Sequence, residues 1–291
     1  MAAAVGASVP LALALFFLHP PRRLHPRNPH SALGIPYERV RFRASDGVTL
    51  RGWYVPAPEN GKVAGQGARG VIVISHGYYG NRSEMLPYLA FLHHAGYAAL
   101  LYDFRAHGWS NGRRATFGLG ETRDLQAAIH WVREHPDLRD LPLFLLGESM
   151  GASVSLMAAA EEERVRAVVA DSPYARFDRA VEGRLRTALG EPVAKVVTPP
   201  TRRVGEWILG VPSDKIAPIE AAAKIAPRPI LLIHGQEDRF IVPDNSRDIQ
   251  QVCTGNAYLW EVPNARHVRS VYVAGDEYPK RVLSFLEAAG E

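Results

Sequence analysis

The sequence predicts an α/β fold in which a mostly parallel, eight-stranded sheet carries helices on both faces. The first observation is a set of short, continuous apolar runs, such as residues 70–75, which are typical of strands buried on both faces of a parallel sheet. The second is that helical stretches separate these runs; Leu125, Ile129 and Val132, for example, recur at helical spacing within residues 121–134. Strands that alternate with helices form a parallel sheet covered on both sides.

An antiparallel hairpin is predicted to open the sheet. Residues 38–43 alternate polar and apolar side chains, Asp46-Gly47 is a hairpin turn signal, and residues 48–55 form the return strand. After the run at 70–75, the remaining strands are predicted at 97–102, 143–146, 165–170, 229–233 and 258–262. The helices are predicted at 84–94, 121–134, 149–162, 247–252 and 278–288.

One interval is too long for an ordinary connection between strands. Nearly sixty residues separate the predicted strands at 165–170 and 229–233, whereas loops and crossovers in such sheets are far shorter. We therefore predict that residues 173–226 hold an insertion of two or three helices. The insertion follows the carboxyl end of a strand, which is the edge at which such sheets bind ligands, so we interpret it as a small cap over the site.

Length and composition indicate one folded domain, residues 37–291, behind a separate N-terminal segment, residues 1–36. The chain has 291 residues, 47% of them hydrophobic and 22% charged, as in globular proteins with a sizeable core. Most of the net charge of +4 comes from three arginines within residues 1–36, so the domain is nearly neutral and no nucleic acid partner is expected. Cys253 is the single cysteine, which excludes an intrachain disulfide and cysteine-rich metal sites. No cofactor or metal is predicted.

The N-terminal segment is interpreted as a membrane anchor. The stretch Ala2–Leu18 has no charged residue and is followed by Arg22, Arg23 and Arg27. Its length is near the lower limit of about 17 residues for a span. We favour a single anchor, with these arginines and the body on the cytoplasmic side. A cleaved signal peptide of an exported protein and a buried or disordered leader are the alternatives. Prolines 20, 21, 26 and 29 predict a stiff spacer before the domain.

The pattern Gly147-Glu148-Ser149-Met150-Gly151 predicts a nucleophilic serine. It follows a predicted buried strand and opens a predicted helix, which is the context that gives this pattern its meaning. The turn is so tight that only glycine fits two positions before and after the serine. The hydroxyl then lies at the N-terminus of a helix, whose dipole stabilises developing negative charge. Ser149 is therefore the predicted nucleophile.

A serine hydroxyl needs a base to accept its proton and an acid to orient that base. In this kind of fold the acid and then the histidine follow the serine along the chain. Asp238 lies four residues past the end of a predicted strand, with Glu237 and Asp244 as nearby rivals. His267 follows the last predicted strand and is the single histidine after Asp238. The sequence therefore predicts a triad of Ser149, Asp238 and His267.

The oxyanion of acyl transfer needs two backbone N–H donors. The first is predicted at Met150, the residue after the nucleophile, and the second in the loop after the 70–75 strand. In that loop Gly77 allows a sharp turn, so we assign the second donor to Tyr78. Tyr78 and Tyr79 are also candidates for lining the pocket.

These motifs resemble the serine α/β-hydrolase superfamily, in the branch that includes Bem46-like hydrolases, monoacylglycerol lipases and the serine aminopeptidase-like group. The resemblance covers residues 37–289 and is carried by these motifs in order: His76-Gly77 with Asn81-Arg82, Asp103-Phe-Arg-Ala-His-Gly108, Gly147 to Gly151, His234-Gly-Gln-Glu-Asp238 with Val242-Pro243, and His267. Ala106 stands where the family usually has a glycine. The resemblance implies the α/β-hydrolase fold and an esterase-like or lipase-like activity without a metal.

The predicted function is hydrolysis of small-molecule or lipid carboxylic esters. A serine peptidase or aminopeptidase, a thioesterase and an acyltransferase would share every motif, and a catalytically silent binding module is a further alternative. An amine-binding site would need acids in the cap, where Glu182, Glu191 and Glu206 are available. Candidate acyl-pocket residues, which are equally candidates for the core of the cap helices, are Tyr174, Phe177, Val181, Leu185, Trp207, Ile208 and Leu209.

Overall fold

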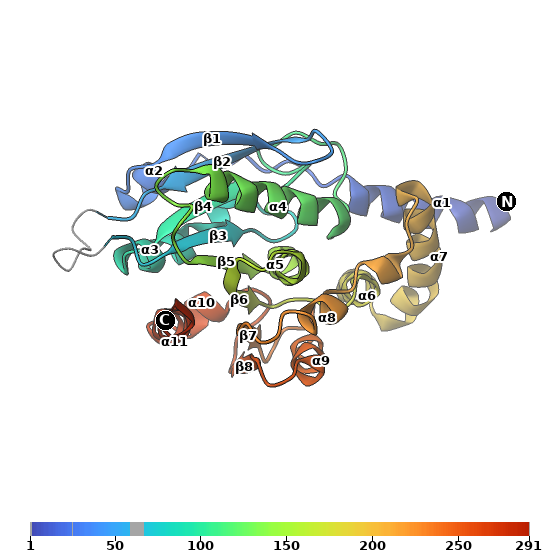
Figure 1. The fold of residues 1–291 in the computed structure, drawn as a ribbon. Coiled ribbons are helices and arrows are strands. Elements are labelled where there is room, and N and C mark those ends of the chain that lie inside the picture. Colours follow the sequence, from blue (N-terminus) through green and yellow to red (C-terminus); the bar gives the residue numbers. More distant parts are fainter. Residues whose placement is uncertain (1, 25, 59–66, 291) are drawn as a thin grey trace.

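An eight-stranded sheet forms the centre of the molecule in the computed structural model, which describes residues 2–24, 26–58 and 67–290 (Figure 1). Its strands are β1 (Glu38–Arg43), β2 (Thr49–Val55), β3 (Val71–Ser75), β4 (Ala98–Asp103), β5 (Leu143–Glu148), β6 (Val165–Asp171), β7 (Ile230–Gly235) and β8 (Ala257–Val262). They are arranged in the order β1-β2-β4-β3-β5-β6-β7-β8. The β1–β2 hairpin is antiparallel and the sheet is mostly parallel, as the sequence predicts; the pair β2–β4 is antiparallel as well.

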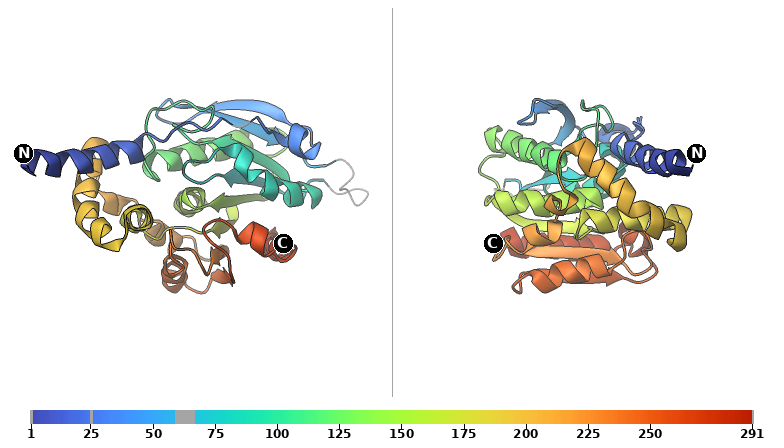
Figure 2. Two further views of the ribbon diagram at one scale, coloured as in Figure 1. Left: turned by 180° about the vertical axis from the view of Figure 1, so that it is seen from behind. Right: turned by 90° about the vertical axis from the view of Figure 1, so that its right-hand side faces the viewer.

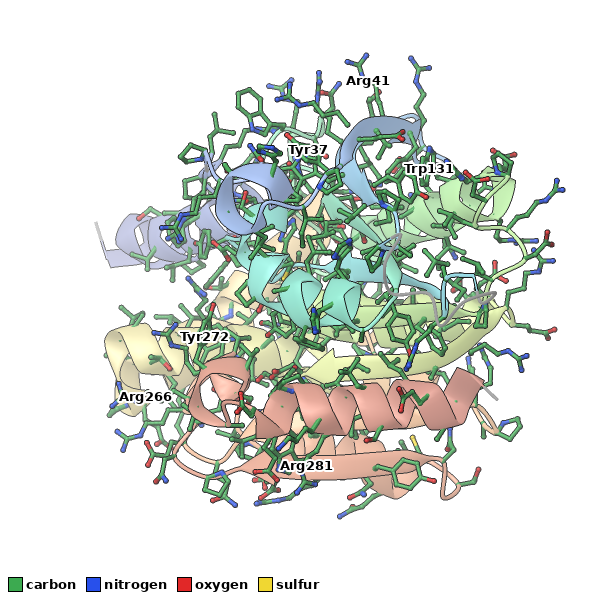
Figure 3. The ribbon with its side chains drawn as sticks, turned by 90° about the vertical axis from the view of Figure 1, so that its left-hand side faces the viewer. Tyr37, Arg41, Trp131, Arg266, Tyr272 and Arg281 are labelled. Carbon is green, nitrogen blue, oxygen red and sulfur yellow. The ribbon has the colours of Figure 1, made fainter. Side chains whose placement is uncertain are left out.

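Helices cover both faces of the sheet. The elements around the strands are η2 (Arg82–Met85), α3 (Leu86–His94), α4 (Leu119–Glu134), α5 (Met150–Glu161), α9 (Asp244–Val252), α10 (Ser270–Val273) and α11 (Glu277–Gly290). Side chains of β3 alternate between the two faces: Val71 and Val73 join the core under α4 and α5, while Ile72 and Ile74 join the core under α3 and α11. Figure 3 looks onto the second face, where α3 and α11 lie side by side.

The parallel strands end at one edge and bring the predicted site together there. In the register of the sheet, Ser75 of β3 is opposite Gly147 of β5, and Glu148 is opposite Asp171 of β6. Asp171 is in turn opposite Ile233 of β7. The segments that follow these strands, which carry Tyr78, Ser149 and Asp238, therefore leave the sheet as neighbours.

The connection from β6 to β7 contains α6 (Phe177–Leu189), α7 (Glu191–Leu209), η3 (Ser213–Lys215) and α8 (Pro218–Ala222). Helices α6 and α7 pack against each other and lie at one end of the molecule (Figures 1 and 2). The side chains of this insertion divide between core and surface. Val181 and Leu185 are buried, whereas Trp207 is 81% exposed.

The N-terminal segment lies against the body. Helix α1 (Ala2–Leu18) runs beside α7, and its first turns project from the molecule (Figures 1 and 2). A short helix, α2 (Pro29–Leu33), precedes β1. Among the described residues we find no helix of the length and apolar character that a membrane crossing requires. The anchor and the side of the membrane on which the body lies stay predictions.

The chain between α1 and α2 is bound to the loops at the carboxyl edge of the sheet. The Arg22 guanidinium donates to the carbonyls of Gly108 (3.1 Å) and Gly112 (2.7 Å), and also to that of Ser110. The Ala115 N–H donates to the Leu18 carbonyl at 2.8 Å. The segment that the sequence predicts as a spacer therefore follows the surface of the domain.

Candidate active site

Ser149 lies in a tight turn between β5 and α5. Its backbone has φ 52° and ψ −115°, a conformation that L-residues rarely adopt. A Cβ on Gly147 would collide with the backbone of Gly151, and a Cβ on Gly151 would collide with the Ser75 carbonyl. Glycine is therefore required on both sides of the serine. The Ser149 N–H donates to the Asp171 carbonyl at 2.8 Å, which ties the strained turn to β6.

Ser149, His267 and Asp238 form a continuous hydrogen-bonded chain. His267 Nε2 is 2.9 Å from Ser149 Oγ, and His267 Nδ1 is 2.6 Å from Asp238 Oδ2. With Nδ1 donating to the carboxylate, Nε2 is left as the acceptor for the serine proton. The His267 ring also lies 4.7 Å from the Phe240 ring, centroid to centroid.

The Asp238 carboxylate is buried and held at both oxygens. Oδ1 accepts the N–H groups of Phe240 and Ile241, each at 2.9 Å. Burial alone would raise the pKa of Asp238, but hydrogen bonds from His234 and His267 outweigh it and lower the pKa to about 2. The rivals that the sequence offered lie elsewhere: Glu237 is exposed, and Asp244 pairs with Arg247 at 2.7 Å.

The loop after β3 is fixed by His76. The Phe104 N–H donates to His76 Nε2 at 3.1 Å, so Nδ1 carries the proton and donates to the Gly77 carbonyl at 2.7 Å. The Gly80 N–H donates to the same carbonyl at 3.0 Å. Burial lowers the pKa of His76 well below its usual range, which keeps the ring neutral in this arrangement.

This geometry orients the Tyr78 N–H. In a trans peptide the carbonyl and the following N–H point in opposite directions, so fixing the Gly77 carbonyl turns the Tyr78 N–H the other way. Within the described part of the chain, neither this N–H nor that of Met150, at the start of α5, donates a hydrogen bond. Gly77 packs close to Ser149, because a Cβ added to it would lie 3.4 Å from the Ser149 Cβ. Two unpaired donors beside a serine hydroxyl suit a developing oxyanion.

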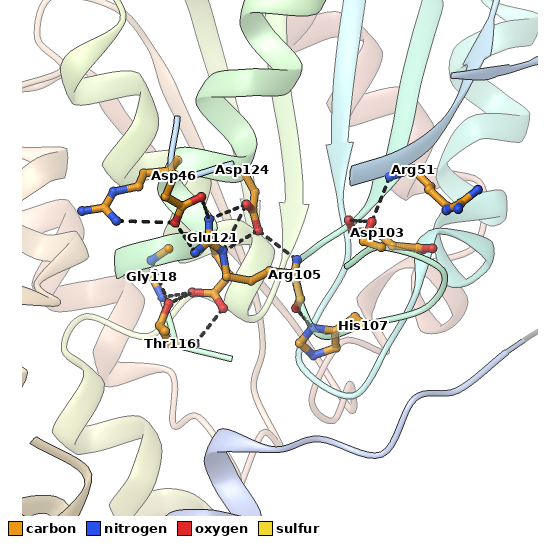
Figure 4. A network of polar contacts seen from close by, with 12 residues as sticks. Asp46, Arg51, Asp103, Arg105, His107, Thr116, Gly118, Glu121 and Asp124 are labelled. Carbon is orange, nitrogen blue, oxygen red and sulfur yellow. Dashed lines mark hydrogen bonds and ion pairs between the residues drawn. The ribbon is translucent and has the colours of Figure 1, made fainter. Parts of the chain in front are cut away.

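The loop after β4 supports this edge through ion pairs (Figure 4). Arg105 contacts the buried Asp124 and the exposed Asp46, each at 2.7 Å. The buried Asp103 accepts from Arg82 at 2.7 Å. Ala106 has φ 59°, in the left-handed region that favours glycine. The departure from the usual family motif is therefore accommodated at the cost of a less favourable backbone conformation.

An apolar cavity of about 30 Å³ lies beside Ser149. Tyr174 lines it, as the sequence predicts for the pocket. Phe177 does not line the cavity directly, but its ring packs against that of Phe117, which does. Tyr79 does not line the cavity either, and its ring packs between Phe16 and Arg184. The full lining is Phe17, Tyr78, Phe117, Ser149, Met150, Tyr174, Ala180, Val181, Arg184, Phe240 and Ile241.

Several of these lining residues are absent from the sequence-based candidates. Phe17, Phe117 and Phe240 come from the N-terminal helix, the loop before α4 and the loop after β7. Phe117 and Phe240 are single apolar residues in loops, and Phe17 is one of many apolar residues in the stretch interpreted as an anchor, so no local pattern assigns them to a pocket. They meet only in the tertiary structure.

The acids of the cap do not face this cavity. Glu206 accepts from the Ser213 hydroxyl at 2.6 Å, and Glu191 pairs with Lys195 at 2.9 Å. Glu182 lines a separate surface depression with Arg179 and Arg186. Arg184 is thus the one charged residue in the lining of the cavity. In the part of the chain that the structure describes, no group of three or more His, Cys, Asp or Glu residues is arranged to hold a metal ion.

Comparison with known proteins agrees with this architecture. The model of a family described as serine aminopeptidase, S33, matches residues 66–210, a range that includes Tyr78 and Ser149. A crystal structure of the Pyrococcus furiosus esterase Pf2001 superposes with a TM-score of 0.76 at 28% identity, covering 94% of this chain and 98% of the other.

Two relatives match in sequence over most of their length. The protein YfhR of Escherichia coli is 26% identical over 97% of this chain and 89% of its own. The polyketide transferase ATR5 of Stachybotrys chlorohalonatus is 24% identical over 86% of this chain and 96% of its own. This chain is thus similar to an esterase, to a family whose description is that of a peptidase, and to a transferase.

Proposed function

We propose that this chain, a member of the α/β-hydrolase superfamily, is a serine hydrolase that cleaves carboxylic esters through an acyl-enzyme on Ser149. The observation that carries the proposal is the hydrogen-bonded chain from Ser149 through His267 to Asp238, next to two unpaired backbone donors. A catalytically silent binding module would have no need for this arrangement.

Each group has a defined part in the proposed reaction. Ser149 Oγ attacks the ester carbonyl carbon while His267 Nε2 accepts the hydroxyl proton. The N–H groups of Tyr78 and Met150 bind the oxyanion, and Asp238 stabilises the imidazolium. His267 then returns the proton to the departing alcohol. Water repeats the sequence on the acyl-enzyme and releases the carboxylic acid.

The cavity favours an ester with an uncharged acyl group over a free aminoacyl substrate. Its lining is aromatic and aliphatic except for Arg184, whose guanidinium lies over the rings of Tyr79 (4.4 Å) and Phe240 (5.1 Å). A substrate ammonium group would be repelled by this cation, and the carboxylates of the cap are directed elsewhere. The similarity to a polyketide transferase makes transfer of the acyl group to an acceptor alcohol the second candidate.

Replacement of the nucleophile tests the proposal. Ser149→Ala is expected to lower kcat/KM for p-nitrophenyl acetate by about 10⁴-fold or more, because the remaining groups cannot form the acyl-enzyme. A fluorophosphonate probe should label the native protein and leave Ser149→Ala unlabelled.

Ser155→Ala is the matched control, since Ser155 lies on α5, the helix that follows Ser149, and its hydroxyl only donates to the Gly151 carbonyl at 2.8 Å. It should retain both labelling and turnover. Unchanged hydrolysis by Ser149→Ala would refute the proposal. Faster consumption of the ester on addition of glycerol, with the glycerol ester as product, would favour the transferase alternative, and cleavage of an aminoacyl p-nitroanilide in preference to the ester would favour a peptidase.

A further inference from the structure

The N-terminal helix contributes a wall to the cavity beside Ser149. Phe17 is 5% exposed and is the one residue in the lining that comes from the segment before the sheet. Its neighbour Phe16 is 54% exposed. The two phenylalanines thus differ sharply in environment although they are adjacent on one helix.

Phe17 is held in place by the same loop that supplies an oxyanion donor. The Tyr78 hydroxyl donates to the Phe17 carbonyl at 2.5 Å, and the next carbonyl, that of Leu18, accepts the Ala115 N–H at 2.8 Å. The Phe17 ring meets the Phe117 ring edge-on, with 6.5 Å between their centroids. Two hydrogen bonds and a ring contact therefore fix its position relative to the nucleophile.

The cavity that Phe17 helps to enclose is small. Its volume of about 30 Å³ compares with about 10–15 Å³ needed for one water molecule in the same measure. A short acyl group can be accommodated with little rearrangement, whereas a long chain needs space that the walls now occupy. Among these walls, Tyr78 and Met150 carry the oxyanion donors, and Phe240 adjoins His267. Phe17 has no part in the chemistry, so its side chain can be changed independently.

We propose that Phe17 is a specificity-determining residue that limits the length of the acyl chain accepted at Ser149. This inference rests on the proposed ester hydrolysis and names the part of the molecule that selects among esters. A helix that precedes the domain thereby acts as part of its substrate site. Removal of the six ring carbons would enlarge this small cavity on the side of α1, next to the apolar side chains that already line it.

The test compares kcat/KM for p-nitrophenyl acetate, butyrate and octanoate in the full-length protein. Phe17→Ala is expected to raise the ratio of octanoate to acetate turnover at least about tenfold, because a few methylene groups in an apolar pocket change specificity by about 10–200-fold. Phe16→Ala is the matched control and should keep the native ratio within about twofold. Phe17→Leu, which keeps an apolar side chain in the interface, should give an intermediate ratio and serves if Phe17→Ala does not fold.

The outcomes separate this inference from the proposed function. An unchanged ratio in folded Phe17→Ala and Phe17→Leu, with Ser149→Ala inactive on all three esters, would overturn the role of Phe17 and leave the esterase proposal intact. An equal shift in Phe16→Ala would also overturn it, because the effect would then belong to the helix as a whole. Activity in Ser149→Ala would overturn the proposed function itself.

Discussion

At the scale of single residues, His76 shows how a buried side chain can serve the proposed reaction from outside the triad. The ring accepts one backbone N–H, from Phe104, and donates to one backbone carbonyl, that of Gly77. Because that carbonyl and the Tyr78 N–H belong to the same peptide unit, His76 sets the direction of the proposed oxyanion donor. We regard His76 as a positioning residue.

Replacement of His76 is therefore expected to affect the transition state more than substrate binding. His76→Ala should lower kcat by about 10–100-fold with little change in KM, since the Tyr78 N–H would no longer be held toward the oxyanion. It should also lower the free energy of unfolding by about 1–3 kcal/mol, because the buried Phe104 N–H loses its acceptor. Steady-state kinetics with p-nitrophenyl acetate and urea denaturation measure both effects.

Asn256→Ala is a suitable control for the kinetic part of this prediction. It removes a partly buried hydrogen bond, from the Asn256 amide to the Arg228 carbonyl at 2.6 Å, at the starts of β7 and β8 and thus at the edge of the sheet opposite the site. It should reduce stability without the fall in kcat. If His76→Ala and Asn256→Ala lose kcat equally, the effect of His76 is general destabilisation.

The residues of the site differ in how far sequence alone can locate them. Ser149, Asp238 and His267 follow from local patterns, because each stands at the end of a strand and their order along the chain is fixed by the sheet. The walls of the cavity do not, because an isolated phenylalanine in a loop has no local signature. Tyr79 illustrates the difference: it adjoins the correct loop, but its φ of 66° turns the side chain toward Phe16 and Arg184.

At the scale of elements, Arg22 links the N-terminal segment to the domain. Its guanidinium donates to the carbonyls of Gly108, Ser110 and Gly112 in the loop after β4. A planar fork of donors suits several converging carbonyls, and the ammonium group of a lysine would reach fewer of them. Arg22 closely follows the end of α1 in the chain, so these hydrogen bonds help to set the position of Phe17.

Arg22→Ala is expected to loosen α1. Hydrogen bonds to a charged group contribute about 1.5–3 kcal/mol when buried, and the exposed position of Arg22 reduces the expected loss to about 1–2 kcal/mol. The amides of residues 8–18 should exchange with solvent at least about fivefold faster, as measured by hydrogen–deuterium exchange, while those of β3 and β5 should not change.

The neighbouring Arg23→Ala is the matched control. The Arg23 guanidinium carbon is 6.0 Å from the centre of the Tyr79 ring, and the hydrogen bond from Asn81 reaches the backbone of Arg23 and not its side chain. Exchange in α1 should therefore remain close to that of the native protein. Faster exchange in both variants would mean that the positive charge of the segment matters and the specific contacts of Arg22 do not.

Strands and helices of the sheet could be predicted from sequence because their patterns are local. Continuous β-branched runs mark buried strands whether or not the rest of the fold is known, and the predicted strand at 165–170 differs from β6 by one residue at its end. Helix α1 could not be placed in this way. An uncharged stretch has the same composition whether it contacts lipid, another helix or a substrate pocket, and the contacts with α7 and Phe117 decide its surroundings.

At the scale of the whole molecule, stability depends on a group of buried acids beneath the nucleophile. Glu148 lies at the end of β5 opposite Asp171 of β6, and the Tyr88 hydroxyl donates to it at 3.2 Å. Burial, together with repulsion from Asp171 and Glu84, raises the pKa of Glu148 from 4.5 to about 8. Burial also raises the pKa of Asp171 from 3.8 to about 6. The folded protein therefore keeps protons that the unfolded chain has lost.

The direction of the pH effect follows from this difference. Between pH 4.5 and about 8 the folded state binds the Glu148 proton and the unfolded state does not, so the free energy of unfolding falls as pH rises through this range. One such group contributes up to about 1.4 kcal/mol for each pH unit. Asp238 acts in the opposite sense, because its pKa is lowered to about 2, but its contribution is lost only below pH 4 and leaves the higher range unaffected.

Glu148→Gln should flatten this pH dependence. The amide keeps an oxygen that can accept the Gly77 N–H and an NH₂ group that can donate to the Tyr88 hydroxyl oxygen, while the ionisable group is removed. Between pH 5 and pH 7, urea denaturation should show a loss of stability in the native protein that exceeds the loss in the variant by about 2 kcal/mol. As a control, replacement of the exposed Glu163 by glutamine should not change how steeply the free energy of unfolding depends on pH, since that carboxylate is solvated. Equal slopes in the native protein and Glu148→Gln would mean that Glu148 is ionised in the folded protein.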